Sequence, residues 1–343
     1  MTIRHLQLVV PDALNQLHLL SQQADRSSGL WALQNLLESG QCSRLWDNED
    51  LSHARVDSWQ QSLLCALPID NREYGIASAR LSWTGEGGLY QDGSFFHAMP
   101  VCLEAGLDDV RWRIPPPLDK IEADAVFTDL QPLISSAGFK LLKTPTEAAA
   151  NWYLWTDKEL TVNTFSLRHF SHYRLRELMP KGSDAPELRR LMTEVQMLLH
   201  AHPVNQKREI NGILPVNALW FYGHAPLKTI SDSVTLDSIV MSNSAYVNGL
   251  CQFLNTSCLE LSDDIESLLH QDAEKILVVL PKETLSSIER HWLRALYPAL
   301  LRGQVNKLDI HLDYWRISLW GGRWAQLCRR FNGKRQTIQD YLP

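Results

Sequence analysis

The second half of the chain alternates short apolar runs with longer amphipathic stretches, and this alternation limits the folds open to it. The apolar runs at 216–222, 238–241 and 275–280 are expected to be strands. Helices are expected to follow at 245–254 and 283–301. Strands joined by helices at this spacing favour a mostly parallel sheet with helices on both faces.

The first half of the chain is expected to begin with a strand and helices, like the second half, and to continue with strands that alternate in character. Residues 6–10 are expected to form a buried strand, followed by helices at 30–37 and 54–66. Residues 108–114 and 151–156 alternate as strands do, and 161–167 is a candidate partner for the second of them. The chain ends in an expected hairpin, 307–312 with 315–320, and a helix at 321–331.

These patterns predict an α/β fold, with a mostly parallel sheet sandwiched by helices and an inserted α+β subdomain. The core is expected to comprise residues 1–100 and 184–343, and the insertion residues 101–183. A chain of 343 residues is long enough to bury a sizeable core without disulfides or structural metals.

Composition narrows the possible partners. The chain has 33 Lys and Arg against 39 Asp and Glu, so nucleic-acid binding is disfavoured as its main role, although a local basic patch could still bind. Its six cysteines are scattered without a CxxC pair, which favours reduced thiols. No stretch reaches the ~18 apolar residues of a membrane helix, and the N-terminus lacks a signal-peptide pattern. We therefore expect a cytoplasmic protein without membrane contact.

The most polar segment of the chain, 194–209, follows the strongest amphipathic pattern. A helix is expected over 184–199, with Asp184 and Glu187 at capping-box spacing and Pro203 stopping it. The polar side chains at its end either converge on a ligand or cap the helix and tie down the following loop. They belong to Glu194, His200, His202, Asn205, Arg208 and Glu209.

The same segment carries a family resemblance. Glu194-Val-Gln-Met-Leu-Leu-His-Ala-His-Pro-Val-Asn205, then Arg208-Glu209 and Gly212-x-x-Pro-Val-Asn-x-x-Trp-x-x-Gly223, resembles the signature of the RpfE-type bacterial regulatory proteins. Within it, Pro215-Val-Asn217-Ala-Leu-Trp220-x-x-Gly223 is similar to a stretch of cofactor-independent phosphoglycerate mutases. The resemblance implies the alkaline-phosphatase type of α/β fold with an inserted subdomain, and it adds Asn217 and Trp220 to the ligand-binding candidates.

The chemistry that this resemblance implies is incomplete in the sequence. Mutases of this superfamily use two divalent metals held by Asp and His, together with a Ser or Thr nucleophile. Asp12 follows the first strand, where the first metal-binding Asp is expected, and it is the one metal-ligand candidate. The Ser-Glu-x-Gly-His nucleophile motif is missing, and no His or Asp occurs between Lys275 and Arg290.

A second candidate surface lies at the C-terminus, where basic and aromatic residues alternate. Such residues bind anionic ligands, nucleic acid or an acidic protein surface by charge and stacking. Alternatively, the tryptophans close the sheet edge while the arginines extend into solvent. The residues are Trp315, Arg316, Trp320, Arg323, Trp324, Arg329 and Arg330.

Three functions follow from these patterns. The leading hypothesis is a catalytically degenerate, phosphoglycerate-mutase-like protein that regulates by binding a small anionic ligand or a protein partner. The second is an active phosphomutase or phosphatase with a rearranged site that uses Asp12, His200 and His202 with Mn²⁺ or Mg²⁺. The third is a nucleic-acid or protein adaptor that binds through the basic C-terminus.

Overall fold

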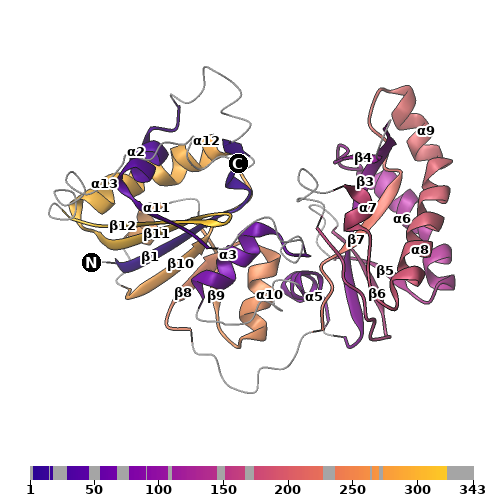
Figure 1. The fold of residues 1–343 in the computed structure, drawn as a ribbon, viewed down its shortest axis with the longest axis horizontal. Coiled ribbons are helices and arrows are strands. Elements are labelled where there is room, and N and C mark those ends of the chain that lie inside the picture. The colour runs from indigo at the N-terminus through magenta and orange to yellow at the C-terminus, as the bar shows by residue number, and fades with distance from the viewer. Residues whose placement is uncertain are drawn as a thin grey trace. The chain divides into compact units, whose positions relative to one another are not determined.

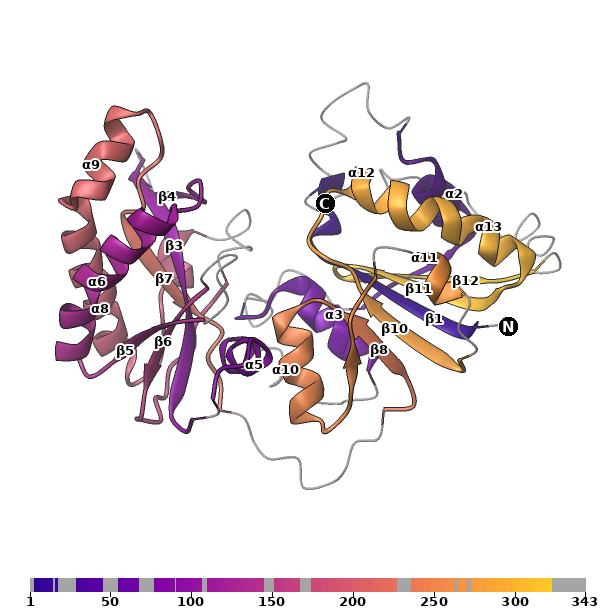
Figure 2. The same cartoon turned by 180° about the vertical axis from the view of Figure 1, so that it is seen from behind.

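The computed structural model divides the chain into two compact units, each drawn from two sides in Figures 1 and 2. Unit 1 comprises residues 1–50, 58–72 and 230–343, and unit 2 comprises residues 51–57 and 73–229. Unit 2 thus begins earlier and ends later than the insertion expected at 101–183. The described residues are 3–14, 16–17, 29–45, 55–67, 77–89, 91–106, 110–144, 151–166, 174–226, 236–262, 265–269 and 273–322.

Unit 1 is built on a seven-stranded sheet. Its strands are β1 (Ile3–Val10), β2 (Gln41–Arg44), β8 (Ile239–Ser242), β9 (Cys258–Leu259), β10 (Lys275–Val279), β11 (Val305–Leu312) and β12 (Trp315–Trp320). They lie in the order β2-β12-β11-β1-β10-β8-β9. The five strands from β11 to β9 are parallel, whereas β12 and β2 pair antiparallel at the other edge. The expected mostly parallel sheet and terminal hairpin are therefore confirmed.

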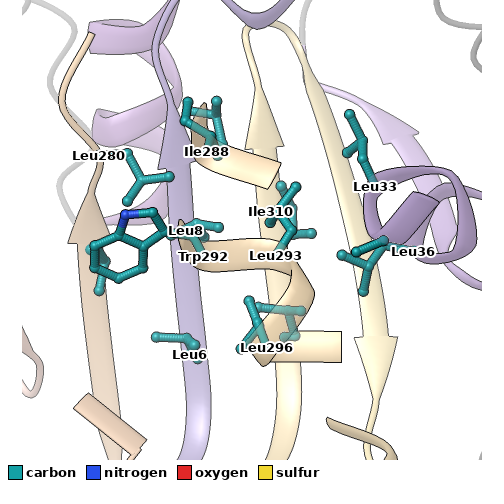
Figure 3. Packing of buried hydrophobic residues seen from close by; sticks show 14 of the residues in the cluster. Leu6, Leu8, Leu33, Leu36, Leu280, Ile288, Trp292, Leu293, Leu296 and Ile310 are labelled. Atoms are coloured by element: carbon teal, nitrogen blue, oxygen red, sulfur yellow. The ribbon is translucent and has the colours of Figure 1, made fainter. Parts of the chain in front are cut away.

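Helices cover both faces of this sheet, as expected. They are α2 (Trp31–Ser39), α3 (Ser58–Ala66), α10 (Ala245–Phe253), α11 (Ile265–Leu269), α12 (Leu285–Ile288), the π-helical turn η4 (Glu289–Leu293) and α13 (Arg294–Arg302). The helices α2, α12 and α13 lie over one face, and α3 lies against β1 and β11 on the other (Figure 1). Figure 3 shows the core under the first group, where leucines and isoleucines of β1 and β11 meet Trp292, Leu293 and Leu296.

A buried carboxylate joins two helices of this layer. Glu289 is 1% exposed, and its two carboxylate oxygens accept hydrogen bonds from the backbone N–H groups of Ala32 and Leu33, at 2.8 and 2.9 Å. These N–H groups belong to the first turn of α2, whose N-cap residue, Leu30, offers no side-chain acceptor. The π-helical turn thus supplies from the second half of the chain the cap that the first half lacks.

Unit 2 has a five-stranded antiparallel sheet. Its strands are β3 (Ser94–Ala105), β4 (Val110–Arg113), β5 (Lys140–Lys143), β6 (Trp152–Thr156) and β7 (Ala218–Tyr222). β6 and β4 pair with opposite ends of the long strand β3, and β7 pairs with β3 at residues 97–101. The run at 216–222 was expected in the parallel sheet, and this expectation is wrong. Its backbone partner is β3, more than 100 residues earlier.

The helices of unit 2 lie on this sheet. They are α5 (Ser78–Gly85), α6 (Lys120–Ser136), α7 (Leu175–Leu178), α8 (Ala185–His200) and α9 (Pro203–Ile210). The expected helix at 184–199 is α8, and its buried stripe packs on α6 and β7. Pro203 does not simply end a helix. It opens α9, because a proline at the first helical position needs no N–H partner there.

Two local expectations near α8 are wrong for one shared reason. The side chain of Asp184 does not cap α8 and instead accepts a hydrogen bond from the backbone N–H of Thr161, at 2.6 Å. Residues 161–166 form no strand beside β6, and only Asn163 forms an isolated bridge, with Lys181. The segment is therefore bound to the start of α8 rather than to the sheet.

Of the expected final helix at 321–331, residues 323–331 lie outside the described residues. Among those that are described, no helix combines the length and the apolar character needed to cross a bilayer.

Candidate functional site

Two asparagines of the signature segment bond to backbone groups inside unit 2. The amide nitrogen of Asn205, which is 1% exposed, donates to the carbonyls of Leu199 and Val216, at 2.7 and 2.8 Å. Its amide oxygen accepts from the N–H of Val216 at 2.8 Å. Asn217 exchanges a pair of 2.8 Å bonds with the backbone of Leu103 in β3. Both side chains thereby hold the loop before β7 in place.

The side chains of Arg208 and Trp220 also form hydrogen bonds with groups of unit 2. The guanidinium of Arg208, 2% exposed, donates to the carbonyls of Leu214 and Pro116 and forms a 2.7 Å ion pair with Glu122 at the start of α6. The indole N–H of Trp220, also buried, donates to the carbonyl of Phe165 at 2.8 Å. Contacts within unit 2 thus give these polar side chains partners that are not ligands.

The two histidines of the segment have different surroundings. His202 is buried, and its Nδ1 accepts from the N–H of Val204, so it caps α9. Its Nε2 lies 3.1 Å from the Asp129 carboxylate. His200 is exposed at the end of α8.

The two acidic candidates are more exposed than His202. Glu194 is half-buried and forms an ion pair with Arg190 at 3.5 Å, and Glu209 is exposed on α9.

Asp12 belongs to unit 1, unlike every other ligand-binding candidate of the sequence. It lies two residues beyond the carboxyl end of β1, with φ 57°, in the left-handed region that Asp tolerates. Asp313 follows the adjacent strand β11 with φ 49°. In open α/β sheets ligands bind beyond the carboxyl ends of the strands. We call the residues that follow these ends in unit 1 the carboxyl edge.

Three further residues gather at the carboxyl edge: Trp59 in the first turn of α3, Tyr246 in the first turn of α10, and Lys282 after β10. The rings of Trp59 and Tyr246 meet edge to face, with centroids 5.6 Å apart. The Lys282 ammonium lies 5.5 Å from the centroid of the Trp59 ring. Neither the indole N–H of Trp59 nor the hydroxyl of Tyr246 finds a hydrogen-bond partner among the described residues, although both atoms are buried.

The hydroxyl of Tyr246 keeps its proton. Burial raises the pKa of this hydroxyl, so at neutral pH it is available as a hydrogen-bond donor. Native structures pair the large majority of buried donors, and an unpaired one costs about 1–3 kcal/mol. Two neighbouring side chains whose donors lack a partner among the described residues, with an ammonium against one of the rings, suit an acceptor-rich, negatively charged group.

The described residues of the carboxyl edge do not fit a two-metal centre. Such a centre needs several carboxylates and imidazoles that converge on the ions. Asp313 is 4% exposed, and its carboxylate accepts from the N–H of Leu14 at 2.9 Å and from the hydroxyl of Ser58 at 2.5 Å. Among the residues described, no three His, Cys, Asp or Glu side chains are grouped closely enough to hold a metal ion.

The basic C-terminal candidates are only partly described. Trp315, Arg316 and Trp320 lie in β12, where successive residues face opposite sides of the sheet, so Trp315 does not share a face with the other two. The Nε of Arg316 donates to the hydroxyl of Ser43 in β2 at 3.3 Å, and Trp320 is 45% exposed. Arg323, Trp324, Arg329 and Arg330 lie outside the described residues.

Sequence reasoning missed Trp59, Tyr246, Lys282 and Asp313. One signal pointed to two of them: Asp313 and Lys282 each follow an apolar run, as Asp12 does. Trp59 and Tyr246 carried no such signal, because they are 187 positions apart in the chain and meet only through the fold.

Comparison with known proteins gives short matches. No protein-family model matches the chain. A probable 2,3-bisphosphoglycerate-independent phosphoglycerate mutase of Geobacter sulfurreducens is 28% identical over 100 residues, which are 28% of this chain and 25% of that protein. A 2,3-bisphosphoglycerate-independent phosphoglycerate mutase of Methanothrix thermoacetophila is 40% identical over 48 residues, 14% of this chain and 12% of that protein. The matches thus span a quarter or less of these relatives.

Two solved structures align with most of the chain at low similarity. One is the cofactor-independent phosphoglycerate mutase from Thermoplasma acidophilum, with 15% identity, a TM-score of 0.40, and coverage of 92% of this chain and 89% of that one. The other is the PH0037 protein from Pyrococcus horikoshii, with 12% identity, a TM-score of 0.43, and coverage of 94% and 88%. The sequence matches make the chain a distant homologue of cofactor-independent phosphoglycerate mutases.

Proposed function

We propose that this chain is a phosphoglycerate-mutase-like protein of the RpfE type that binds a small anionic ligand at the carboxyl edge of unit 1 and acts in regulation without phosphoryl transfer. The observation that carries the proposal is the pair of buried donors, the Trp59 N–H and the Tyr246 O–H, that find no partner among the described residues and lie beside the Lys282 ammonium.

The electrostatics of this place favour an anion. An acceptor group that reaches both donors removes their desolvation cost, and charge-assisted hydrogen bonds are stronger than neutral ones. Tyr246 lies in the first turn of α10, a helix of nine residues whose N-cap residue, Ser244, makes no side-chain cap. The N-terminus of such a helix carries partial positive charge. Lys282 adds a full charge at the end of β10.

Loss of catalysis is inferred from the residues at hand. Asp12 is the one member of the metal set that the family resemblance places, and the carboxylate of its neighbour at the edge, Asp313, is engaged by Leu14 and Ser58. The motif that carries the nucleophile in the mutases is missing from the sequence.

Binding is tested by calorimetric titration of the purified chain with inorganic phosphate and with 3-phosphoglycerate. We expect saturable binding of at least one probe, weakened about tenfold or more by Trp59→Phe, Tyr246→Phe or Lys282→Gln. Lys275→Gln is the matched control, because Lys275 is exposed at the opposite end of the same strand, β10. Failure of both probes to bind at millimolar concentration, or equal binding by all variants, would contradict the proposal.

Catalysis is tested separately, with phosphoglycerate mutase and phosphatase assays in the presence of Mn²⁺ or Mg²⁺. We expect no turnover above that of a heat-denatured control. Turnover that Asp12→Asn abolishes would instead establish the alternative, a phosphoryl-transfer enzyme with a rearranged site.

A further inference from the structure

Two cysteines of unit 1 are brought together by a tight turn. Cys251 lies in the last turn of α10, and Cys258 begins β9 seven residues later. Asn255, with φ 52°, reverses the chain between them, and the N–H of Thr256 donates to the carbonyl of Cys251 at 2.9 Å. β9 is then held beside β8 by parallel pairing. The end of α10 packs against β9, and the two thiols are close enough to influence each other's pKa.

The two thiols have different surroundings. Cys251 is 3% exposed, whereas Cys258 is half-buried, with its Sγ 3.7 Å from the carbonyl of Ser242. Interaction with the Cys251 thiol lowers the pKa of Cys258, and the same interaction, with burial, raises the pKa of Cys251. Such an arrangement pairs a half-buried, more acidic thiol with a buried, less acidic one, as in cysteines that respond to oxidants.

We propose that Cys251 and Cys258 are a redox-responsive dithiol, which hydrogen peroxide converts into an intramolecular disulfide. The Cys258 thiolate attacks one peroxide oxygen, so that an S–O bond forms, the O–O bond breaks, and the departing hydroxide takes a proton to become water. The sulfur of Cys251 then attacks the sulfur of Cys258. An S–S bond forms, the S–O bond breaks, and the leaving hydroxyl takes the thiol proton of Cys251 to form a second water. Two thiols lose two electrons, and one peroxide is reduced.

This inference does not depend on the anion site, because neither thiol belongs to the carboxyl edge. It also has a convenient readout. The sequence has no Lys or Arg between Lys228 and Lys275, so trypsin releases residues 229–275 as one peptide that contains only these two cysteines.

The experiment treats the reduced full chain with a small excess of hydrogen peroxide, then with iodoacetamide, and digests it for mass spectrometry. We expect the 229–275 peptide to lose two hydrogens and resist alkylation, and dithiothreitol to restore two alkylated cysteines. Cys65→Ser is the control, because Cys65 is an exposed thiol on α3, and its loss should leave disulfide formation unchanged.

Two substitutions of Cys251 separate the roles of its thiol. Cys251→Ser keeps a hydrogen-bond donor, so Cys258 should alkylate at near the wild-type rate but form no disulfide. Cys251→Ala removes the donor as well, so alkylation of Cys258 at pH 7 should slow several-fold. The proposal is overturned if peroxide leaves both cysteines of the folded wild-type chain open to alkylation, or if Cys258 passes to sulfinic acid in the presence of Cys251.

Discussion

Two groups of buried polar side chains, one in each unit, differ in how they are paired. In unit 2 the signature residues Asn205 and Arg208 give their hydrogen bonds to backbone groups and to one carboxylate. In unit 1 the buried polar atoms of Trp59, Tyr246 and His311 have no partner in the described part of the chain. The contacts within unit 2 thus account for the buried polar residues of the signature segment, and the proposed anion site lies outside that segment.

The largest effect is expected from breaking the asparagine bridge in unit 2. Asn205→Ala removes bonds to Leu199 and Val216 and leaves buried backbone groups without partners, which we expect to cost about 3 kcal/mol of unfolding free energy. Hydrogen exchange should show lost protection in α9 and β7. Asn211→Ala is the control, because Asn211 is exposed at the end of α9. Unchanged protection in the Asn205 variant would show that the signature is not needed for packing.

A pH series compares one buried histidine from each unit. Burial lowers the pKa of His311 in β11 to about 4, and neither ring nitrogen has a partner among the described residues. The unfolded chain, with a histidine pKa near 6.5, binds the proton more readily. Stability therefore falls as pH drops from about 6.5 to 4, by roughly 3 kcal/mol at most. Denaturant unfolding of His311→Leu should show a flatter pH profile.

The histidine of unit 2 sharpens this contrast. Burial also lowers the pKa of His224, but its Nε2 lies 3.1 Å from the carbonyl of Leu160, to which it can donate. His224→Leu should therefore destabilise the chain at pH 7 by about 1 kcal/mol or more, whereas His311→Leu should not, because it leaves no broken hydrogen bond. Equal losses in both variants at pH 7 would remove the distinction between partnered and unpartnered histidines.

The smallest effects come from two buried tyrosines. The hydroxyl of Tyr153 in unit 2 donates to the Glu86 carboxylate at 3.0 Å, whereas that of Tyr246 in unit 1 has no partner among the described residues. Tyr153→Phe should cost about 1–2 kcal/mol of stability. Tyr246→Phe should leave stability unchanged or raise it in the absence of an anion, because it removes an unpaired buried hydroxyl. Thermal unfolding without and with phosphate measures both. A large loss for Tyr246→Phe without phosphate would mean that its hydroxyl is already satisfied.

The elements that depend on local sequence patterns were predicted correctly. The stripe of α8 and the hairpin of β11 and β12 lie within a residue or two of their expected bounds, because helical and strand periodicity are set by near neighbours. The strand β7 was expected in the parallel sheet and belongs to the antiparallel one. A short apolar run looks the same in either sheet, and its partner β3 is distant in sequence.

The candidate residues show a similar limit. The sequence identified Asn205 and Asn217 as polar groups in an unusual density, but a side-chain amide can serve a ligand or a backbone loop equally well. Which partner the amide binds depends on the groups that the fold places beside it. The meeting of Trp59 with Tyr246 is likewise a product of the fold.

The position of β1 has a consequence for the order in which the protein forms during synthesis. β1 lies between β10 and β11, so it has neither neighbour until residues 275–312 have left the ribosome. Unit 2 is nearly continuous, from residue 73 to 229, and can fold before the strands that pair with β1 have been made. We expect the nascent chain to carry the apolar β1 unpaired while residues 11–274 are made, and unit 1 to close after unit 2, because its sheet pairs strands that are far apart in the sequence.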